Sequence, residues 1–370
     1  MGRKNAYIRL LLMPFAIIYR MVTDVRNMLF DLNILPSEKF PVPVICVGNI
    51  SAGGTGKTPF TEYLICLLKD QYRVATLSRG YKRRTKGLVI ADENCTADNV
   101  GDELCQIKRK FPDIIVAADA NRCRAIRRLL ALPEGKRPDV ILLDDAMQHR
   151  YVRASLTIML TDYNALYYDD DLLPAGNLRE SVYAVSRADI VVVTKCREDI
   201  KPIELRLMEK NMSLMANQRL YFSGISYHKI EPLFPSKNMK ACSLPEINRN
   251  ESILLITGVA SPQPLIEVMK SCCDDVHVCS FPDHHAFDRL DIQRIDDEFR
   301  KITSPSCKII CTEKDAMRLK PLGFLPGKWK SCLYYLPISV TFLPGRRDDF
   351  DAIILKHIIS TISILQKKEC

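Results

Sequence analysis

The feature that most constrains the fold is an apolar run that leads through a glycine-rich loop into an amphipathic stretch. The run is Val44-Ile-Cys-Val47, and the loop is Gly48-Asn-Ile-Ser-Ala-Gly-Gly-Thr-Gly-Lys-Thr-Pro59. A strand, a small-residue loop and a helix in this order form a P-loop, in which backbone N–H groups converge on phosphate oxygens. The loop departs from the pattern G-x-x-x-x-G-K-[ST] at its first position, where Ser51 stands. The segment therefore predicts a nucleotide-binding α/β domain.

The residue types in this loop assign individual roles. Lys57 has the length to reach the β- and γ-phosphates of ATP, and the hydroxyl of Thr58 suits ligation of Mg²⁺. The glycines supply the backbone freedom that such a loop needs. The predicted nucleotide-binding residues are Gly53, Gly54, Thr55, Gly56, Lys57 and Thr58.

A second apolar run, Val140-Ile-Leu-Leu143, ends in the paired carboxylates Asp144 and Asp145. P-loop enzymes hold the water shell of their Mg²⁺ with a carboxylate at the end of a neighbouring strand. Gln148 and His149 follow directly, where a loop beside the γ-phosphate would bring them within reach of metal or substrate. We therefore predict the metal ligands Thr58, Asp144 and Gln148, and we predict catalytic roles for Lys57 and Asp145.

The rest of the chain alternates short apolar runs with amphipathic stretches, which is typical of β-α units with a mostly parallel sheet. The strands predicted in the first alternation are Val42–Val47, Arg73–Leu77, Ile114–Ala117, Val140–Leu143, Leu156–Leu160 and Ile190–Thr194. A second alternation contains the predicted strands Ile253–Gly258, Val276–Ser280 and Lys308–Cys311, and the predicted helices Pro264–Ser271 and Asp291–Lys301.

The pattern loosens between Leu220 and Leu244, which predicts a domain junction in that stretch. A chain of 370 residues is also long enough to build two cores. The predicted fold class is α/β, with a P-loop NTPase-like α/β/α domain, a second and smaller α/β domain, and an N-terminal amphipathic helix. The predicted ranges are an N-terminal helix (1–35), a P-loop domain (36–218), a linker (219–250), a second α/β domain (251–345) and a C-terminal helix (346–370).

Composition narrows the class of partner. Hydrophobic residues make up 47% of the chain and charged residues 26%, as in globular proteins rather than disordered chains. The formal net charge of +9 indicates an anionic partner: nucleic acid, anionic lipid or a phosphorylated substrate. The basic residues are scattered and no aromatic-interleaved motif occurs, which argues against nucleic acid. The 14 cysteines include no C-x-x-C pair and many lie in apolar runs, so we expect free thiols in a reducing cytoplasm.

The N-terminal segment is nearly all apolar from Leu10 to Tyr19 and is flanked by arginine and lysine. Ten residues are too few to span a bilayer, which needs about 20. The helical spacing of the apolar residues continues to Phe30, so we expect one amphipathic helix, interrupted near Pro14. Such a helix either seats on a membrane surface or packs on the core of the protein itself.

Seven segments along the chain stand out together as motifs. They are Gly48–Pro59, Ser78-Arg-Gly-Tyr81, Val100-Gly-Asp-Glu103, Asp144-Asp-Ala-Met-Gln-His149, Leu172-Leu-Pro-Ala-Gly-Asn-Leu-Arg-Glu180, Phe281-Pro-Asp-His-His285 and Thr312-Glu-Lys-Asp315. Taken in order, these motifs resemble the tetraacyldisaccharide 4′-kinase family, which phosphorylates the disaccharide precursor of lipid A at the inner membrane. The resemblance covers nearly the whole chain. It departs from the family pattern in small ways, at Leu104, Ala146 and Asn177, and none of these removes a reactive group.

The resemblance implies transfer of the γ-phosphoryl of ATP to the 4′-hydroxyl of a tetraacylated glucosamine disaccharide 1-phosphate, with Mg²⁺ as the metal. It implies that Asp102 acts as the base on the hydroxyl and that His284 assists it, with His285 as the alternative. These adjacent histidines could instead belong to a helix start capped by Asp283. The implied substrate-binding residues are Arg79, His149, Arg179 and Glu180. Thr312–Asp315 either serves as a hinge or contacts the nucleotide base.

A lipid substrate favours a membrane-seating role for the N-terminal helix over packing on the core. It places the enzyme peripherally on the cytoplasmic face of the bacterial inner membrane. No obligate protein partner is evident from the sequence, and no nucleic-acid partner is expected.

Two rival functions share the loop. The first is a P-loop switch ATPase or GTPase of the partitioning or metal-chaperone type. A GTPase reads its base with N/T-K-x-D, whereas Val193-Thr194-Lys195-Cys196-Arg197 has arginine at the position of the aspartate, which argues against guanine. The second is a nucleic-acid-binding ATPase, which the net charge permits.

Overall fold

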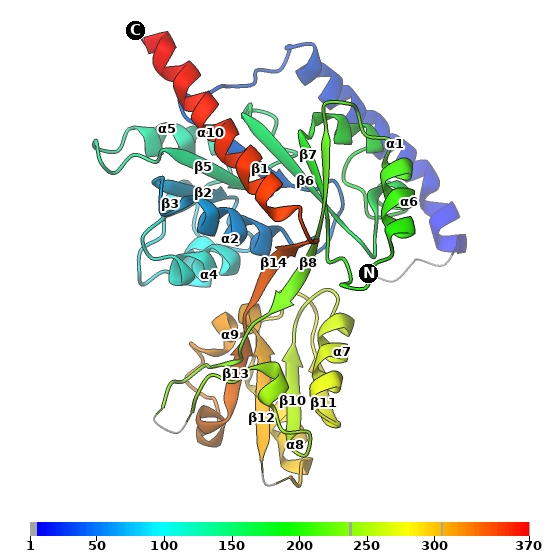
Figure 1. Ribbon diagram of the computed structural model, residues 1–370, viewed down its shortest axis with the longest axis vertical. Helices are drawn as coiled ribbons and strands as arrows, with labels where there is room; N and C mark the ends of the chain where they lie inside the picture. Colours follow the sequence, from blue (N-terminus) through cyan, green and yellow to red (C-terminus); the bar gives the residue numbers. More distant parts are fainter. Residues whose placement is uncertain (1–5, 237–238, 305, 370) are drawn as a thin grey trace. The chain divides into compact units, whose positions relative to one another are not determined.

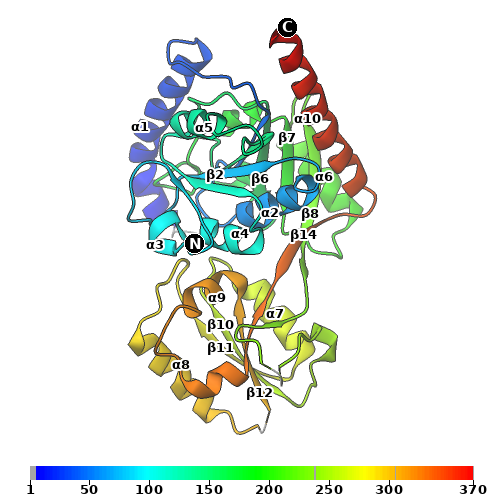
Figure 2. The same ribbon diagram turned by 90° about the vertical axis from the view of Figure 1, so that its left-hand side faces the viewer.

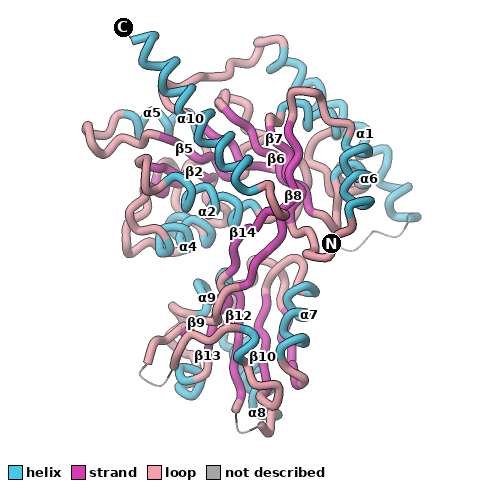
Figure 3. Tube along the Cα trace, in the orientation of Figure 1, coloured by secondary structure: helices cyan, strands magenta, loops and turns pink. Residues whose placement is uncertain are grey.

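The computed structural model describes residues 6–236, 239–304 and 306–369. The chain divides into two compact units (Figure 1). The first unit runs to Ile225 and resumes at Val340, and the second comprises Ser226–Ser339. The chain passes between the units inside two strands, β8 and β14, which are neighbours in one sheet (Figure 3). The second unit is therefore an insertion into the first.

Within the described residues, the first unit is built on a nine-stranded sheet with the order β14-β8-β7-β6-β1-β5-β2-β4-β3. The pairings from β8 to β4 are parallel, and β3 is antiparallel to β4. The strands are β1 (Val44–Gly48), β2 (Val74–Ser78), β3 (Val89–Ile90), β4 (Ile115–Ala118), β5 (Val140–Asp144), β6 (Leu156–Asp162), β7 (Ile190–Thr194), β8 (Arg219–Tyr227) and β14 (Ile338–Phe342).

Helices cover both faces of this sheet. Alternate residues of a strand point to opposite faces, so Val47 packs in one core and Cys46 in the other. The first core holds α2 (Lys57–Leu68), α4 (Asp102–Lys110) and α10 (Arg347–Glu369), and the second side holds α5 (Arg122–Leu130) and α6 (Pro202–Met212) (Figure 1). The remaining helices of the unit are α1 (Ala6–Asp31), α3 (Ala97–Val100), η1 (Tyr167–Asp169) and η2 (Val182–Arg187). This is the predicted α/β/α architecture, and because its strands are parallel, their carboxyl ends meet at one edge.

The second unit has a five-stranded sheet with the order β11-β10-β12-β13-β9, parallel except for β9. Its α8 and α9 pack on one face around Trp329, and α7 packs on the other (Figure 2). The elements are β9 (Glu231–Pro232), η3 (Leu244–Glu246), β10 (Ser252–Thr257), α7 (Gln263–Cys272), β11 (Asp275–Ser280), α8 (Arg289–Lys301), β12 (Cys307–Thr312), α9 (Glu313–Leu319), η4 (Gly327–Ser331) and β13 (Leu333–Leu336).

The predicted fold class is confirmed, and the predicted strands and helices lie within one or two residues of those observed. One expectation was wrong, because helix α1 continues through Pro14 without the expected interruption. Within the range 219–250 that was predicted as a linker, the structure has the nine-residue strand β8, with the mixed sequence Arg219-Leu-Tyr-Phe-Ser-Gly-Ile-Ser-Tyr227. The predicted domain ranges, with boundaries at residues 35, 218, 250 and 345, stay a prediction.

Helix α1 combines contacts to the first unit with a large exposed apolar surface. Phe30 is buried and meets Tyr151 edge-on, and the Tyr19 hydroxyl donates to the Arg179 carbonyl. No helix in the described residues combines the length and apolar character needed to cross a bilayer. The exposed apolar residues of α1 are Tyr7, Ile8, Leu10, Leu11, Met13, Phe15, Ile17, Ile18, Met21, Val22, Val25 and Met28.

Candidate active site

The P-loop connects the carboxyl end of β1 to the start of α2. Its conformation requires glycine at two positions, Gly53 (φ +124°) and Gly56 (φ +82°). The buried Asn49 side chain donates to the Thr55 hydroxyl at 3.0 Å, which fastens the two ends of the loop to each other. Lys57, the first residue of α2, has its Nζ 3.5 Å from Asn49 Oδ1. Hydrogen bonds between its own polar side chains therefore hold the P-loop in this conformation.

The paired carboxylates after β5 occupy different electrostatic environments. Asp145 has a left-handed backbone (φ +51°) and pairs with Lys57 Nζ at 3.6 Å and with Arg179 Nη1 at 3.2 Å. Burial acts to raise the pKa of Asp145, but Lys57, Arg179 and Arg122 outweigh it and hold the pKa below its ordinary value. Asp144 is 1% exposed, and burial, Glu103 and Asp145 raise its pKa to about 7. The charge of Asp145 is therefore compensated by cations, whereas at Asp144 burial and acidic neighbours outweigh the effect of Lys57.

Asp144 has the properties of a magnesium ligand. Its Oδ1 is buried and finds no hydrogen-bond partner among the described residues. Among all the residues that the structure describes, no group of three or more His, Cys, Asp and Glu side chains is arranged to hold a metal. Mg²⁺ in nucleotide sites is held by one or two protein oxygens together with phosphates and waters. A carboxylate with one unsatisfied oxygen beside a P-loop fits this ion better than it fits a metal bound by protein groups alone.

Arg179 and Glu180 reach the site because their segment pairs with the P-loop. The Arg179 N–H donates to the Ile50 carbonyl at 2.7 Å, and the Ala52 N–H donates to the Asn177 carbonyl at 2.6 Å. Glu180 is buried and accepts a hydrogen bond from Arg187. Its second oxygen has no hydrogen-bond partner within the described residues. The segment therefore brings one cation to Asp145 and one unsatisfied carboxylate oxygen to the same region.

Asp102 lies at the start of α4, where two glycines allow a close backbone approach. Gly101 (φ +95°) precedes it, and a Cβ at that position would lie 3.3 Å from Gly80 Cα. Gly80 (φ +72°) has no room for a Cβ either, because one would lie 2.8 Å from the Val100 carbonyl oxygen. This contact joins the Ser78–Tyr81 and Val100–Glu103 motifs. Together with burial, the charge of Glu103, the second residue of α4, raises the pKa of Asp144.

Arg122 is the residue of this region that the sequence analysis missed. It is 5% exposed, its Nη1 donates to the Ala120 carbonyl at 3.1 Å, and its Nε finds no hydrogen-bond partner in the described residues. Burial lowers the pKa of its guanidinium, while Asp145 and Asp144 act in the opposite direction. Arg122 follows a predicted strand, which is β4 in the structure. The sequence does not reveal that β4 pairs with β2, and that β2 in turn pairs with β5, the strand that ends in the paired carboxylates.

The pKa of His149 is affected by its burial and by the charge of Arg122. Burial, followed by Arg122 and Arg26, lowers the pKa of His149 to about 4, so the imidazole is neutral at physiological pH. Its Nε2 is buried and lacks a hydrogen-bond partner among the described residues. Gln148 is fixed differently, since its side-chain nitrogen donates to the Asn49 carbonyl at 2.8 Å. Arg79, predicted alongside these residues, follows β2 and is exposed.

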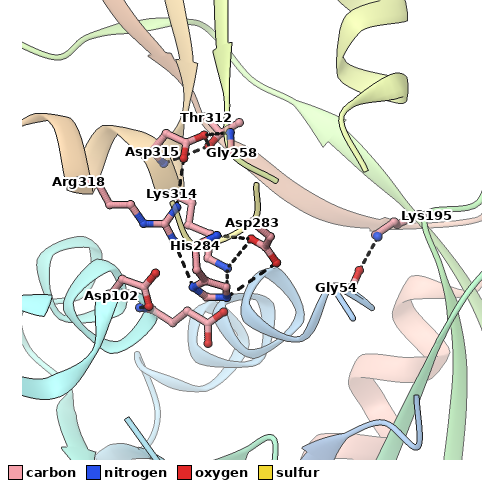
Figure 4. Close-up of polar contacts among 11 residues, drawn as sticks. Gly54, Asp102, Lys195, Gly258, Asp283, His284, Thr312, Lys314, Asp315 and Arg318 are labelled. Carbon is pink, nitrogen blue, oxygen red and sulfur yellow. Dashed lines mark hydrogen bonds and ion pairs between the residues drawn. The ribbon is translucent and has the colours of Figure 1, made fainter. Parts of the chain in front are cut away.

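In the second unit, His284 lies in a polar cluster (Figure 4). Its backbone is left-handed (φ +58°), and its ring nitrogens lie 3.2 Å from Lys314 Nζ and 3.2 Å from Arg318 Nη2. Arg318 in turn pairs with the fully buried Asp315, which accepts from the Gly258 N–H at 2.8 Å and the Thr312 hydroxyl at 2.6 Å. The Thr312–Asp315 motif therefore anchors the cation that faces His284.

His285 has a different environment from His284. Its ring stacks on Phe281, and its Nε2 lies 2.6 Å from Asp291 Oδ2. Asp291 belongs to a capping box at the start of α8 whose N-cap is Asp288. The alternative in which Asp283 caps this helix is therefore wrong, and His285 is the histidine with the helix-supporting contact.

A family model described as "Tetraacyldisaccharide-1-P 4'-kinase" matches residues 8–359. The chain belongs to the tetraacyldisaccharide 4′-kinase family. A tetraacyldisaccharide 4′-kinase of Parabacteroides distasonis is 52% identical over 352 residues, which cover 95% of each chain. One of Flavobacterium johnsoniae is 47% identical over 354 residues, covering 95% of this chain and 97% of the relative. A crystal structure of LpxK from Aquifex aeolicus in complex with ATP matches with a TM-score of 0.72 and 27% identity, covering 95% of this chain and 99% of the other.

In this member of the kinase family, most of the predicted site residues of the first unit lie close together. Lys57, Asp145 and Arg179 are joined by ion pairs, and Asp144 lies beside Asp145. Asp102 belongs to the first unit and His284 to the second. Their joint action stays a prediction.

Proposed function

We propose that this chain transfers the γ-phosphoryl of ATP to the 4′-hydroxyl of a tetraacylated glucosamine disaccharide 1-phosphate in lipid A biosynthesis. The observation that carries the proposal is the P-loop whose Lys57 pairs with Asp145, next to Asp144 with its unsatisfied buried Oδ1, in a chain of the 4′-kinase family. The kinase relatives match over nearly the whole chain, which disfavours the switch-ATPase alternative.

In the proposed mechanism, backbone N–H groups of residues 53–58 bind the triphosphate and Lys57 exchanges Asp145 for the phosphate oxygens. Thr58, Asp144 and Gln148 would hold Mg²⁺, which when bound neutralises charge on the β- and γ-phosphates. Asp145 keeps Arg179 turned toward the transferred group. Asp102 accepts the proton of the 4′-hydroxyl, and His284 assists it.

The acidic and basic groups around His149 are proposed to bind the glucosamine and its 1-phosphate. Phosphate oxygens accept from guanidinium groups, and Arg79, Arg122 and Arg179 supply three of them. His149 and Glu180 each retain an unsatisfied buried polar atom, which a sugar hydroxyl would satisfy. The neutral imidazole of His149 and the carboxylate of Glu180 would then offer different hydrogen-bonding partners to the sugar.

Replacing Arg122 with methionine is expected to raise the KM for the lipid substrate about tenfold or more, because a charged hydrogen bond is worth about 1.5–3 kcal/mol. The KM for ATP should change far less. Steady-state kinetics with each substrate varied in turn measures both constants. Arg128→Met, at an exposed arginine of the same helix, is the matched control. An unchanged lipid KM would exclude Arg122 from the substrate site.

Asp315→Asn is expected to lower kcat by about tenfold to a hundredfold, because the Arg318 contact that orients His284 is weakened. The same change should lower the free energy of unfolding by about 1–3 kcal/mol, since Asp315 is fully buried. Kinetics and chemical denaturation measure the two effects. Asp274→Asn, at an exposed position of the same unit, should change neither. A destabilised variant with normal kcat would separate Asp315 from catalysis.

We further propose that the protein acts peripherally on the cytoplasmic face of the inner membrane. Support comes from the exposed apolar residues of α1, which are interspersed with the exposed Arg9 and Arg20. Apolar side chains enter the acyl boundary while arginines reach lipid phosphates. The same arrangement would deliver Tyr19 and Arg26, which contact Arg179 and Gln148, to the plane of the substrate headgroup.

The proposed activity is tested by transfer of ³²P from labelled ATP to a purified disaccharide 1-phosphate lipid in detergent micelles with Mg²⁺. Thin-layer chromatography should show a labelled lipid with the native chain and none with Lys57→Ala. Hydrolysis of ATP that is independent of lipid, without a labelled product, would instead support a switch ATPase.

A further inference from the structure

Thr194 and Lys195, at the carboxyl end of β7, contact the P-loop directly. Lys195 Nζ donates to the Gly54 carbonyl at 2.5 Å (Figure 4) and to Asp162 Oδ2 at 2.6 Å. The hydroxyl of the buried Thr194 lies 2.9 Å from the Thr55 carbonyl oxygen. Two successive carbonyls of the loop are therefore bound by side chains from a strand that is two positions away from β1 in the sheet.

These contacts are made with the carbonyl oxygens of Gly54 and Thr55, and the orientation of these peptide groups decides where the N–H groups of the P-loop point. A phosphate-binding loop must turn its N–H groups toward the ligand, so its carbonyls turn away and need other partners. Gly53 and Gly54 are exposed and lie close to Gly56 in the sequence, and such glycines lose much conformational entropy when they are ordered. A partner that fixes the carbonyls in advance removes part of that cost from nucleotide binding.

The position of Lys195 indicates that it is held for this purpose. Its backbone is left-handed (φ +59°), a conformation that costs a lysine free energy, and its side chain is 19% exposed. Asp162, at the end of β6, also binds the ammonium, and its side chain is 14% exposed. The ammonium of Lys195 is thus held by the Asp162 carboxylate while it binds the Gly54 carbonyl. Both contacts are partly buried, and a charged hydrogen bond is stronger there than at an open surface.

We propose that Lys195 is a positioning residue of the nucleotide site. Anchored by Asp162, it holds the Gly54 carbonyl away from the phosphates, so that the P-loop meets ATP in its binding conformation. The Thr-Lys pair thereby has a role other than reading a guanine base. The inference depends on the proposed function only in taking ATP as the nucleotide.

The test compares Lys195→Met, Lys195→Arg, Asp162→Asn and the double variant Lys195→Met/Asp162→Asn with the native chain. Lys210→Met, at an exposed lysine of α6, is the control. The measurements are the Kd of ATP with Mg²⁺ by calorimetry, the KM for ATP and for lipid, kcat, and the thermal unfolding midpoint. Calorimetry is done without lipid, so it reads the nucleotide site alone.

Lys195→Met is expected to raise the Kd and KM for ATP by about tenfold to a hundredfold, as for loss of a charged hydrogen bond. The lipid KM and kcat should stay within about twofold of the native values, because the lysine acts through the loop. Lys195→Arg should recover most of the affinity. Asp162→Asn should weaken ATP binding in the same direction, and the double variant should be no weaker than Lys195→Met, since both changes break one clamp.

An unchanged ATP Kd in Lys195→Met would overturn the proposal. Additive losses in the double variant would also overturn it, because they indicate separate contacts of Lys195 with the nucleotide. If Lys195→Met weakened ATP binding, raised the lipid KM and lowered the unfolding midpoint together, the lysine would be assigned to stability alone. If Lys195→Met does not fold, Asp162→Asn and Lys195→Arg decide the question. A native chain that binds ATP but does not phosphorylate lipid would refute the proposed function and leave the ATP comparison intact.

Discussion

Replacing Asp102 with asparagine is expected to lower kcat for lipid phosphorylation by roughly 10²- to 10⁴-fold, the usual contribution of a general base. Asparagine preserves the shape of the side chain at the start of α4, including an oxygen that can accept from the Glu103 N–H. It cannot take the proton of the attacking hydroxyl. The Kd for ATP should stay unchanged, because the P-loop and its carboxylate partners are untouched.

The measurement is a single-turnover assay of phosphoryl transfer, which reports the chemical step and not product release. Asp113→Asn, an exposed aspartate after the same helix, is the matched control. A variant that lost ATP affinity and kcat together would place Asp102 in nucleotide binding. A native rate in Asp102→Asn would remove it from the proton transfer.

Replacing Lys57 with alanine is expected to weaken ATP binding by roughly 10²- to 10³-fold, because about two charged hydrogen bonds to phosphate are lost. Its ammonium is 3.6 Å from Asp145 Oδ1 and its side chain is 14% exposed, so it is already ordered at the loop. Calorimetry with ATP and Mg²⁺ measures the loss. Lys69→Ala, at the C-cap of the same helix, should bind ATP normally. Native affinity in Lys57→Ala would contradict a phosphate contact.

The contrast between these two variants separates binding from chemistry. Asp102→Asn should retain affinity and lose turnover, whereas Lys57→Ala should lose affinity first. Equal loss of ATP affinity in both would invalidate the assignment of roles in the first unit.

The sequence predicted the parts of the fold that depend on local patterns. Buried parallel strands such as β1 and β5 are continuous apolar runs, and the glycines of the P-loop mark the turn that follows β1. Strand β8 was not predicted because Ser223 and Gly224 interrupt its apolar character, and it is stabilised by pairing with β7 and β14. Pairing between distant segments is a tertiary property that a local pattern does not carry.

The same distinction applies to the site. Lys57 and Asp144 were predicted because each ends or follows a recognisable strand. Arg122 was missed because its importance comes from the order of strands in the sheet, which places the loop after β4 near the paired carboxylates. The different surroundings of His284 and His285 also depend on the tertiary structure, since the contact of His285 with Asp291 in the capping box of α8 is not visible in the sequence, and the catalytic role of His284 stays a prediction.

The insertion of the second unit between β8 and β14 has a consequence for how the protein is made. Helix α10 contributes Phe350, Ile354 and Ile358 to the same core as Phe60 of α2, and it follows the insertion in the chain. During synthesis from the N-terminus, the inserted unit leaves the ribosome with its own sheet and cores complete, while the nucleotide-binding unit still lacks its last helix. Helix α2, which begins in the P-loop at Lys57, can therefore acquire this packing only after the inserted unit has been synthesised, which couples the appearance of kinase activity to the synthesis of α10.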